Sequence, residues 1–340
     1  MIADQVDVFL NRIQVGRPVH VENLTVIPLL KGADWRSEAS SYLTLDEGLA
    51  SGLVKLREVG LDGIVSVIEL ENLSSRPVLI LDGEELSGAK QNRVPNSTIL
   101  APAKSTIRVP VSCVEAGRWS YRSEELKPSG RAHFCSGRAA KLASVAESRK
   151  RGGQAHADQH RVWEDIDLLA ESLLASSPTA SMSEIFDQRQ DALDRYSKEI
   201  TSTPDQVGAV FAIGGRIEGV EIFDRSETFD SMLVKLVESY AVGALVNKHN
   251  LGILIGAEHA RSFLNALRSP DWNSYPGIGI GTELHLKNEE IVASALALDE
   301  HVVHVAAFRV PPDRTSGGLR WDRDSLDLGP DDGSAFDLAA

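Results

Sequence analysis

The strongest constraint on folding is a repeated pattern of alternating apolar runs that meet at two-residue turns. VGAVFAI and RIEGVEIF flank Gly214-Gly215, and VASALAL and HVVHVAAF flank Asp299-Glu300. Such turns between alternating runs are typical of β-hairpins. PVLIL and EEL flank Asp82-Gly83 in the same way, so we predict three hairpins, which reflect either a distant duplication or features that all hairpins share. The core is therefore expected to be antiparallel.

Strands and helices are expected in separate blocks along the chain. Short β-branched or alternating runs predict strands over residues 24–29, 53–59, 64–71, 77–81 and 105–112. Apolar stripes at helical spacing predict helices near residues 44–50, 162–173, 184–200, 226–245 and 258–268. Thr44 and Glu47 have the spacing of a capping box, as do Ser181 and Glu184, and Ser226 is expected to cap its helix.

These elements predict an α+β fold with a β-rich, sandwich-like core of antiparallel strands and hairpins and a helical insertion. We divide the chain into a β-rich half that carries the polar motifs (residues 1–134), a helical insertion with a basic loop (135–203), a half of β-hairpins and a helix that packs on the first (204–310), and an acidic tail (311–340). The composition of the tail predicts disorder.

Charge and composition argue against several classes of partner. The formal net charge is −14 over 340 residues, so phosphate backbones would repel the chain and nucleic acid is not an expected partner. No apolar run approaches the ~20 residues that a membrane-spanning helix needs, and the N-terminus lacks signal-peptide features. Cys113 and Cys135 form no CxxC pair, which argues against a disulfide scaffold or a structural zinc site. We expect a cytoplasmic protein without a membrane partner, and a homo-oligomer stays an open alternative.

Residues 81–93, LDGEELSGAKQNR, combine a dense set of polar groups with predicted strands and form the leading candidate site. Cationic side chains suit phosphate or carboxylate, and amides suit a base edge or hydroxyls. Gly88 and Ala89 would let a ligand or another backbone approach. A solvated edge strand and loop is the alternative interpretation. The candidate catalytic residues are Glu84 and Glu85, and the candidate binding residues are Lys90, Gln91, Asn92 and Arg93.

Residues 111–119, VSCVEAGRW, form a second candidate wall of the same site. Cys113 and Glu115 are two residues apart, so on a strand they face the same side. Glu115 is a further catalytic candidate, while Arg118 and Trp119 offer substrate a planar cation beside an aromatic face. No local base or cation is available to activate Cys113, so a packed structural cysteine is favoured over a nucleophile.

Weaker candidates lie elsewhere in the chain. Glu221 lies in an apolar strand and, if buried, needs a cation, which we expect Lys90 or Arg93 to supply. His304 is expected to be a satisfied core histidine, and Cys113, Glu221 and His304 are candidates for residues that support the site from behind. The basic run 149–151 is either a solvated loop or a lid over an anionic ligand. GIGIG at 277–281 is a weak dinucleotide fingerprint because it precedes a strand.

LDGEEL, GAKQNR and PVSCVEAGRW, with softer apolar patterns from VGAVFAIGGRIEGVEIF to VVHVAAF, resemble a bacterial protein family. It is the family named for association with ADP-ribosylglycohydrolases (ARG) and the rhodanese-phosphatase superfamily. The resemblance is clearest outside the helical insertion and the acidic tail. It implies a context of ADP-ribose, NAD-derived or other phosphorylated small molecules and directs attention to the same residues, but it implies no mechanism.

Three functions fit these observations. The first is an enzyme, a hydrolase or transferase, that acts on a phosphorylated, nucleotide-like or ADP-ribose-related small molecule. The second is a non-catalytic nucleotide or anion sensor, or a partner-binding module, that uses the same pocket. The third makes the polar cluster a structural network between two β-rich halves. The sequence identifies no cofactor or metal, and it contains no GxxxxGK[ST], GxSxG or HExxH motif.

Overall fold

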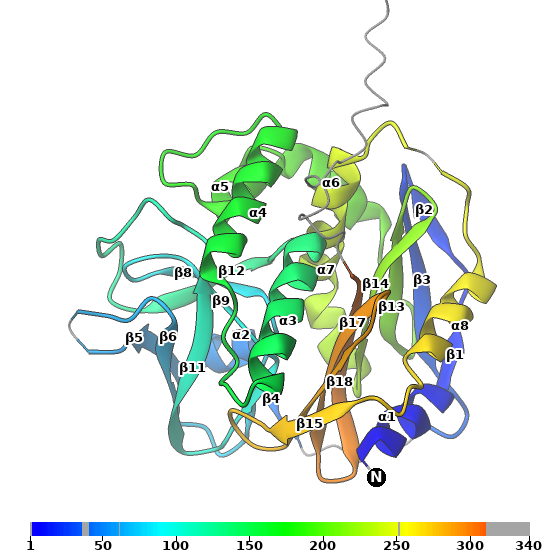
Figure 1. Cartoon of the computed structure of the whole chain (residues 1–340), viewed down its shortest axis with the longest axis horizontal. Helices are drawn as coiled ribbons and strands as arrows, with labels where there is room; N and C mark the ends of the chain where they lie inside the picture. The colour runs from blue at the N-terminus through cyan, green and yellow to red at the C-terminus, as the bar shows by residue number, and fades with distance from the viewer. Residues whose placement is uncertain (1, 36–40, 61, 251, 311–340) are drawn as a thin grey trace, which may run out of the picture.

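The computed structural model describes residues 2–35, 41–60, 62–250 and 252–310; the predicted acidic tail lies outside them. Its strands form antiparallel sheets beside packed helices, which confirms the predicted β-rich α+β class. In Figure 1 the strands of a six-stranded sheet lie on one side and those of a nine-stranded sheet on the other, with several helices between them.

The nine-stranded sheet comes mainly from the C-terminal part of the chain. Its order is β1-β3-β13-β14-β18-β17-β16-β15, and β2 pairs with β3. The hairpins predicted at Gly214-Gly215 and Asp299-Glu300 are confirmed, because β13 pairs with β14 and β17 with β18. The strands are β1 (Ile13–Val15), β2 (Val19–Val21), β3 (Leu24–Lys31), β13 (Gln206–Ile213), β14 (Arg216–Phe223), β15 (Asn273–Pro276), β16 (Thr282–Lys287), β17 (Ile291–Leu298) and β18 (His301–Arg309).

Two smaller sheets come from the N-terminal part, in the orders β12-β8-β9-β11-β6-β5 and β10-β7-β4. Only β4 and β7 pair in parallel among the described strands. The strands are β4 (Leu43–Thr44), β5 (Val54–Glu58), β6 (Val67–Asn72), β7 (Val78–Ile80), β8 (Glu84–Gly88), β9 (Arg93–Pro95), β10 (Ile99–Ala101), β11 (Ser105–Cys113) and β12 (Leu126–Ala132).

The third predicted hairpin, at Asp82-Gly83, is wrong. β7 and β8 belong to different sheets, so the turn carries the chain from one sheet to the other. Gly83 has φ +78°, and a Cβ there would lie 2.9 Å from Cδ of Arg138. Glycine therefore allows both the backbone geometry of the turn and the approach of a buried arginine to Asp82.

The helices cover both faces of the nine-stranded sheet. α1 and α8 pack on one face through residues such as Phe9 and Phe263. α3 and α7 pack on the other face and reach the N-terminal sheets, so that one apolar core joins Leu81, Leu142, Phe211 and Tyr240. The helices are α1 (Ile2–Asn11), α2 (Leu45–Ala50), α3 (Cys135–Lys150), α4 (Gln159–Ser172), α5 (Met182–Asp187), α6 (Gln190–Glu199), α7 (Ser226–Val246) and α8 (Ala257–Ala266).

The predicted cap positions are correct for α2 and α5 and wrong by one residue for α7. Thr44 and Glu47 form the expected capping box of α2. Ser181 occupies the N-cap of α5, but its side chain makes no capping bond, so the predicted capping box is absent; its backbone forms a bridge with Glu115. Ser226 is already the first residue of α7 and Arg225 takes the cap position, so the hydroxyl cannot act as the cap. No helix within the described residues is long and apolar enough to cross a membrane.

Candidate functional site

The candidate segment is folded into the interior instead of forming an open polar loop. β8 runs from Glu84 to Gly88, a tight turn follows, and β9 begins at Arg93. Gly88 has φ +117°, and a Cβ there would meet Oγ of Ser123 at 2.4 Å and a backbone oxygen at 2.8 Å. The predicted close approach is therefore made by another stretch of backbone. Within this hairpin Glu84, Glu85 and Arg93 are fully buried.

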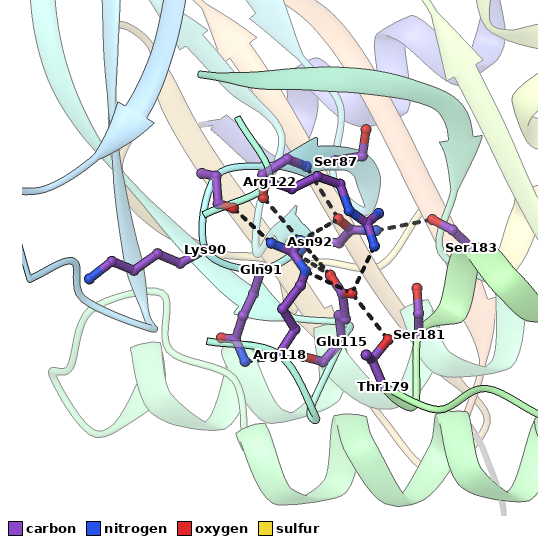
Figure 2. A network of polar contacts seen from close by, with 12 residues as sticks. Ser87, Lys90, Gln91, Asn92, Glu115, Arg118, Arg122, Thr179, Ser181 and Ser183 are labelled. Carbon is purple, nitrogen blue, oxygen red and sulfur yellow. Dashed lines mark hydrogen bonds and ion pairs between the residues drawn. The ribbon is translucent and has the colours of Figure 1, made fainter. Parts of the chain in front are cut away.

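Glu115 and Arg118 form the centre of a buried polar cluster (Figure 2). Arg118 binds the carboxylate through Nε at 2.9 Å and Nη2 at 2.6 Å, and the backbone N–H of Asn92 and the hydroxyl of Thr179 each donate at 3.1 Å. Burial alone would raise the pKa of Glu115, but these donors, chiefly Arg118, outweigh it and lower the pKa. The carboxylate is therefore ionised and saturated by groups of the protein itself.

Asn92 links this carboxylate to a second one. Its Oδ1 accepts from Nη2 of Arg118 at 3.2 Å, and its Nδ2 donates to Glu85 at 3.2 Å. Glu85 also accepts from the hydroxyls of Ser183 at 2.5 Å and Ser129 at 2.8 Å. Its donors are neutral, so burial prevails and raises the pKa of Glu85. We call Glu85, Asn92, Glu115, Arg118, Thr179 and Ser183 the Glu115 network.

Arg93 is less well satisfied than its neighbours. Its Nη1 donates to Oε1 of Gln91 at 3.0 Å, but Nε and Nη2 are buried and have no hydrogen-bond partner. The nearest carboxylate is that of Glu58, 3.7 Å from Nη2, and Oε2 of Glu58 is also unpartnered. Burial lowers the pKa of Arg93, with Cys113 and Glu58 acting in the opposite direction. A buried cation with unfilled donors beside an unfilled acceptor is costly unless something else binds there.

The surface above Arg93 is aromatic and cationic. The ring of Trp119 lies 5.7 Å from the guanidinium carbon of Arg93, and Nζ of Lys90 lies 5.2 Å from the same ring and 5.1 Å from the ring of Tyr121. Trp119 is 47% exposed and Tyr121 54% exposed. Figure 2 shows the side chain of Lys90 extending away from the Glu115 network. We call Lys90, Trp119, Tyr121 and the half-exposed Arg122 the rim.

A second buried network joins the two β-rich parts through helix α3. Asp82 pairs with Lys141 and with Nε of Arg138 at 3.4 Å, and Arg138 continues to Glu221 at 2.6 Å. Glu221 bonds Nε2 of His304 at 3.0 Å. Burial acts to lower the pKa of Arg138, but the charges of Glu221 and Asp82 outweigh it and raise that pKa, whereas burial prevails at Lys141 and lowers its pKa.

Thr98 closes this network into a ring. Its Oγ1 lies 3.1 Å from Nδ1 of His304 and accepts from the backbone N–H of Asp82 at 3.1 Å. His304 is thus a core histidine with both ring nitrogens bonded, as predicted. We call Asp82, Thr98, Arg138, Lys141, Glu221 and His304 the Asp82 network.

Glu84 and Glu85 are adjacent on β8 and point to opposite faces, as a strand requires. Glu84 faces helix α7, where its carboxylate pairs with Lys235, which also pairs with Asp46 at 2.5 Å. Burial raises the pKa of Glu84, and Lys235 opposes this rise. The two candidate carboxylates therefore cannot act on one substrate from a common side of the sheet.

The chemical options of the site follow from this burial. Glu84, Glu85 and Glu115 are fully buried and bonded within the protein. Burial raises the pKa of the Cys113 thiol, while Arg93 opposes this rise, and Cys113 and Cys135 are both free. The raised pKa fits the predicted structural role of Cys113. Across the described ranges, no group of three or more His, Cys, Asp or Glu side chains is placed to hold a metal ion.

Several predicted residues lie together and others do not. Residues of both motifs meet in the Glu115 network, at Arg93 and at the rim. Glu221 and His304 lie in the Asp82 network, and Arg138, not Lys90 or Arg93, pairs with Glu221, so that prediction is wrong. Arg138 reaches Glu221 from helix α3, and the position of this helix beside β14 follows from the tertiary fold and not from residue spacing.

Glu58 was not among the predicted residues, although its strand carries a signal for it. In VKLRE the buried positions alternate, and Glu58 falls in line with Val54 and Leu56. A carboxylate at an inward position of a strand needs a partner or a function. Lys235 was missed as well, because it occupies one position of a long apolar helix and only the tertiary fold brings it to Glu84.

Comparison with known proteins gives one assignment. No curated protein and no solved structure matches the chain. The model of the ARG and Rhodanese-Phosphatase-superfamily-associated Protein domain matches residues 12–308. This match spans both polar motifs, the helical stretch and both β-rich parts. The chain therefore belongs to the family of ARG and Rhodanese-Phosphatase-superfamily-associated Protein domains.

Proposed function

We propose that the protein binds a phosphorylated, nucleotide-like small molecule at the rim, above Arg93. The observation that carries this proposal is the guanidinium of Arg93, which is fully buried yet keeps two unfilled donors directly beneath the partly exposed ring of Trp119. Native proteins satisfy nearly all such buried donors, so an unfilled pair is a candidate for a bond to a ligand.

The groups around Arg93 match the parts of a nucleotide. Exposed aromatic rings stack on bases, a contact worth roughly 1–3 kcal/mol per base. Lys90 and Arg122 add cations for phosphate, and Oε2 of Glu58 offers an acceptor for a sugar hydroxyl. The ring of Trp119 covers Arg93, so displacement of this ring would open the guanidinium to the ligand.

Binding without turnover is favoured over catalysis as the primary role. The three carboxylates first considered for catalysis are shielded and bonded inside the protein. An enzyme that acts on the same ligand is the second candidate, supported by Glu58, whose Oε1 lies 3.7 Å from Arg93 and whose Oε2 has no hydrogen-bond partner and could act as a base. The association in the family name supports a context of ADP-ribose or other phosphorylated metabolites, and we further propose a cytoplasmic bacterial protein.

Calorimetric titration of the full chain with ADP-ribose, ADP, AMP, adenosine and inorganic phosphate tests this proposal. Trp119→Ala should weaken nucleotide binding roughly ten- to a hundred-fold, and Lys90→Ala should weaken it less. Lys127→Ala is the matched control, because Lys127 is an exposed lysine on β12 outside the rim. Chromatography of the incubated ligand then distinguishes a sensor from an enzyme that forms product. Equal affinity in wild type and Trp119→Ala, or no binding of any phosphorylated ligand, would contradict the proposal.

A further inference from the structure

A cleft of about 310 Å³ lies where three parts of the chain meet. Strands β6 and β11, the last turn of α3 with the loop that follows it, and the loop between β15 and β16 form its walls. Its lining includes Val67, Arg108, Pro110, Arg149, Gln154 and Ile278. Arg149 belongs to the basic run and Ile278 to the GIGIG segment, two features of the sequence that the proposed function does not use.

This cleft lies on the opposite face of the sheet from Arg93. Arg93 is paired in register with Cys113, and directly opposed residues point to the same face. Arg108 and Pro110 are an odd number of positions from Cys113 along β11, so they point to the other face. The cleft and the rim are therefore separate sites that can be tested with separate variants.

The charge in the cleft is of one sign. Two arginines and one amide supply its polar groups, and no carboxylate is among its lining residues. Arg108 is exposed and forms no ion pair with the part of the chain that the structure describes. On the adjacent strand Arg108 is opposed by Glu69, while Arg57 on the next strand is paired with Glu71 at 2.6 Å. The charged side chains that line the cleft itself are both cationic.

Arg149 is held in place but not saturated. Its Nη2 pairs with Glu283, and its guanidinium carbon lies 5.8 Å from the ring of Tyr275. Its Nε is buried and has no hydrogen-bond partner. Glu283 in turn accepts from Nε2 of His285 at 2.9 Å if that nitrogen carries the proton. Arg149 therefore has a fixed orientation and an unused donor.

The loop that carries Gln154 is anchored from both sides. The amide of the buried Asn96 donates to the backbone oxygen of Ala155 at 2.9 Å, and the hydroxyl of Ser148 donates to that of Gln154 at 2.8 Å. These bonds fix the loop beside β11 before any ligand arrives. A preformed wall lowers the entropic cost of binding.

We propose that this cleft binds a small organic anion that carries an apolar group, with a phosphate monoester as the favoured chemistry. Arg108 and Arg149 bind the anionic oxygens, and Gln154 donates to or accepts from the ester end. Val67, Pro110 and Ile278 contact the apolar group. The volume is at the lower end of the range of small-molecule sites, which limits the ligand to a compact one.

Phenyl phosphate, inorganic phosphate and phenol, titrated separately into the full chain by calorimetry, test this site. Phenyl phosphate should bind most tightly, since only it carries both the charge and the apolar group. Arg108→Ala should weaken its binding roughly ten-fold or more, because an exposed side chain without ion pairs can be removed without disturbing the fold. Arg149→Lys keeps the charge near Glu283 and should weaken binding less. Arg17→Ala is the control, an exposed arginine between β1 and β2.

Each possible result either supports or overturns the site. Loss of binding in Arg108→Ala with normal affinity in Arg17→Ala and Lys90→Ala supports the site. Equal losses in Arg108→Ala and Arg17→Ala indicate attraction to surface charge only and overturn it. A loss confined to Lys90→Ala assigns the ligand to the rim and also overturns it, while leaving the proposed function intact. No binding of phenyl phosphate at millimolar concentration overturns it as well.

Discussion

The Glu115 network and the Asp82 network are both buried and charged, yet they connect the chain at different scales. The first centres on an ion pair between residues three apart, takes four of its six members from the two neighbouring motifs, and reaches the helical stretch through Thr179 and Ser183. The second bonds residues up to 206 positions apart and passes through helix α3. The first therefore connects the N-terminal motifs with the adjacent helical stretch, and the second connects the two β-rich parts.

This difference indicates how buried charge is used in this protein. Removing one partner of a buried pair costs far more than the pair contributes, because the other charge is left unpaired. A network that spans several elements therefore raises the free energy of any arrangement of those elements that leaves its buried charges unpaired. A structural network between two halves, the third function considered from the sequence, is proposed here for the Asp82 network, while ligand binding is proposed for the rim.

Arg138→Ala should have the largest effect on stability. It leaves Asp82 with only Lys141 as a charged partner and Glu221 with only a hydrogen bond to the ring of His304, and all of these groups are fully buried. We expect a loss of roughly 3–5 kcal/mol in the free energy of unfolding, measured by urea denaturation. A loss below about 1 kcal/mol, similar to that of an exposed arginine, would remove the proposed role of this network.

Arg118→Ala should lower the free energy of unfolding somewhat less, by roughly 2–4 kcal/mol. Glu115 loses its two strongest bonds but keeps the donors from Asn92 and Thr179. Arg122→Ala is the control, since its exposed guanidinium lies 3.7 Å from the same carboxylate. We expect the control to stay within about 0.5 kcal/mol of wild type. If Arg118→Ala were costlier than Arg138→Ala, the contrast between a local and a spanning network would be reversed.

The pH dependence of stability should separate two carboxylates of the Glu115 network. The pKa of Glu85 is raised from 4.5 in the folded state. Its contribution to the free energy of unfolding is therefore complete below pH 4.5 and is lost as the pH rises through its pKa in the folded protein. The pKa of Glu115 is lowered, so its contribution is present above the unfolded pKa and is lost as the pH falls through the folded value.

Glu85→Gln should therefore become more stable relative to wild type as the pH rises from 4.5 toward neutrality. Glu115→Gln should become less stable relative to wild type as the pH rises through the acid transition of Glu115. Urea denaturation at a series of pH values measures both differences. If the stability difference between variant and wild type changed with pH in the same direction for both variants, the donors around these two carboxylates would be assigned wrongly.

Lys90→Ala should have a small effect on stability. Its ammonium donates to a backbone oxygen at 2.6 Å and lies over two exposed rings, contacts worth about 0.5–1 kcal/mol at exposed sites. Thermal unfolding should change by only a few degrees, and ligand binding should change more. A large loss of stability would place Lys90 among the structural residues and weaken its role in the rim.

The sequence predicted what depends on neighbours along the chain. Alternating runs around Gly214-Gly215 specify a hairpin through local geometry, and polar residues close in sequence meet in the Glu115 network. The alternation at Asp82-Gly83 gave a wrong hairpin because the side chain of Asp82 is drawn to Arg138 and Lys141, which lie more than fifty residues away.

The partners of the polar motifs were the hardest part to predict. Ser183 and Thr179 are ordinary hydroxyl residues, and only the placement of the helical stretch brings them to Glu85 and Glu115. Lys235 lies in a helix whose other residues are mostly apolar, so its pairing with Glu84 has no signal in local spacing. Glu58 could have been found, because strand alternation alone places it inside.

Hydrogen–deuterium exchange of the full chain with and without saturating ADP-ribose tests the proposed rim most directly. We predict slower exchange in the peptides that contain residues 88–93 and 117–122, because a ligand that bonds Arg93 and stacks on Trp119 would hold this hairpin and loop. Trp119→Ala should abolish the protection and Lys127→Ala should retain it. Unchanged exchange in these peptides at a ligand concentration that saturates binding, or protection elsewhere only, would contradict the assignment of the ligand to this surface.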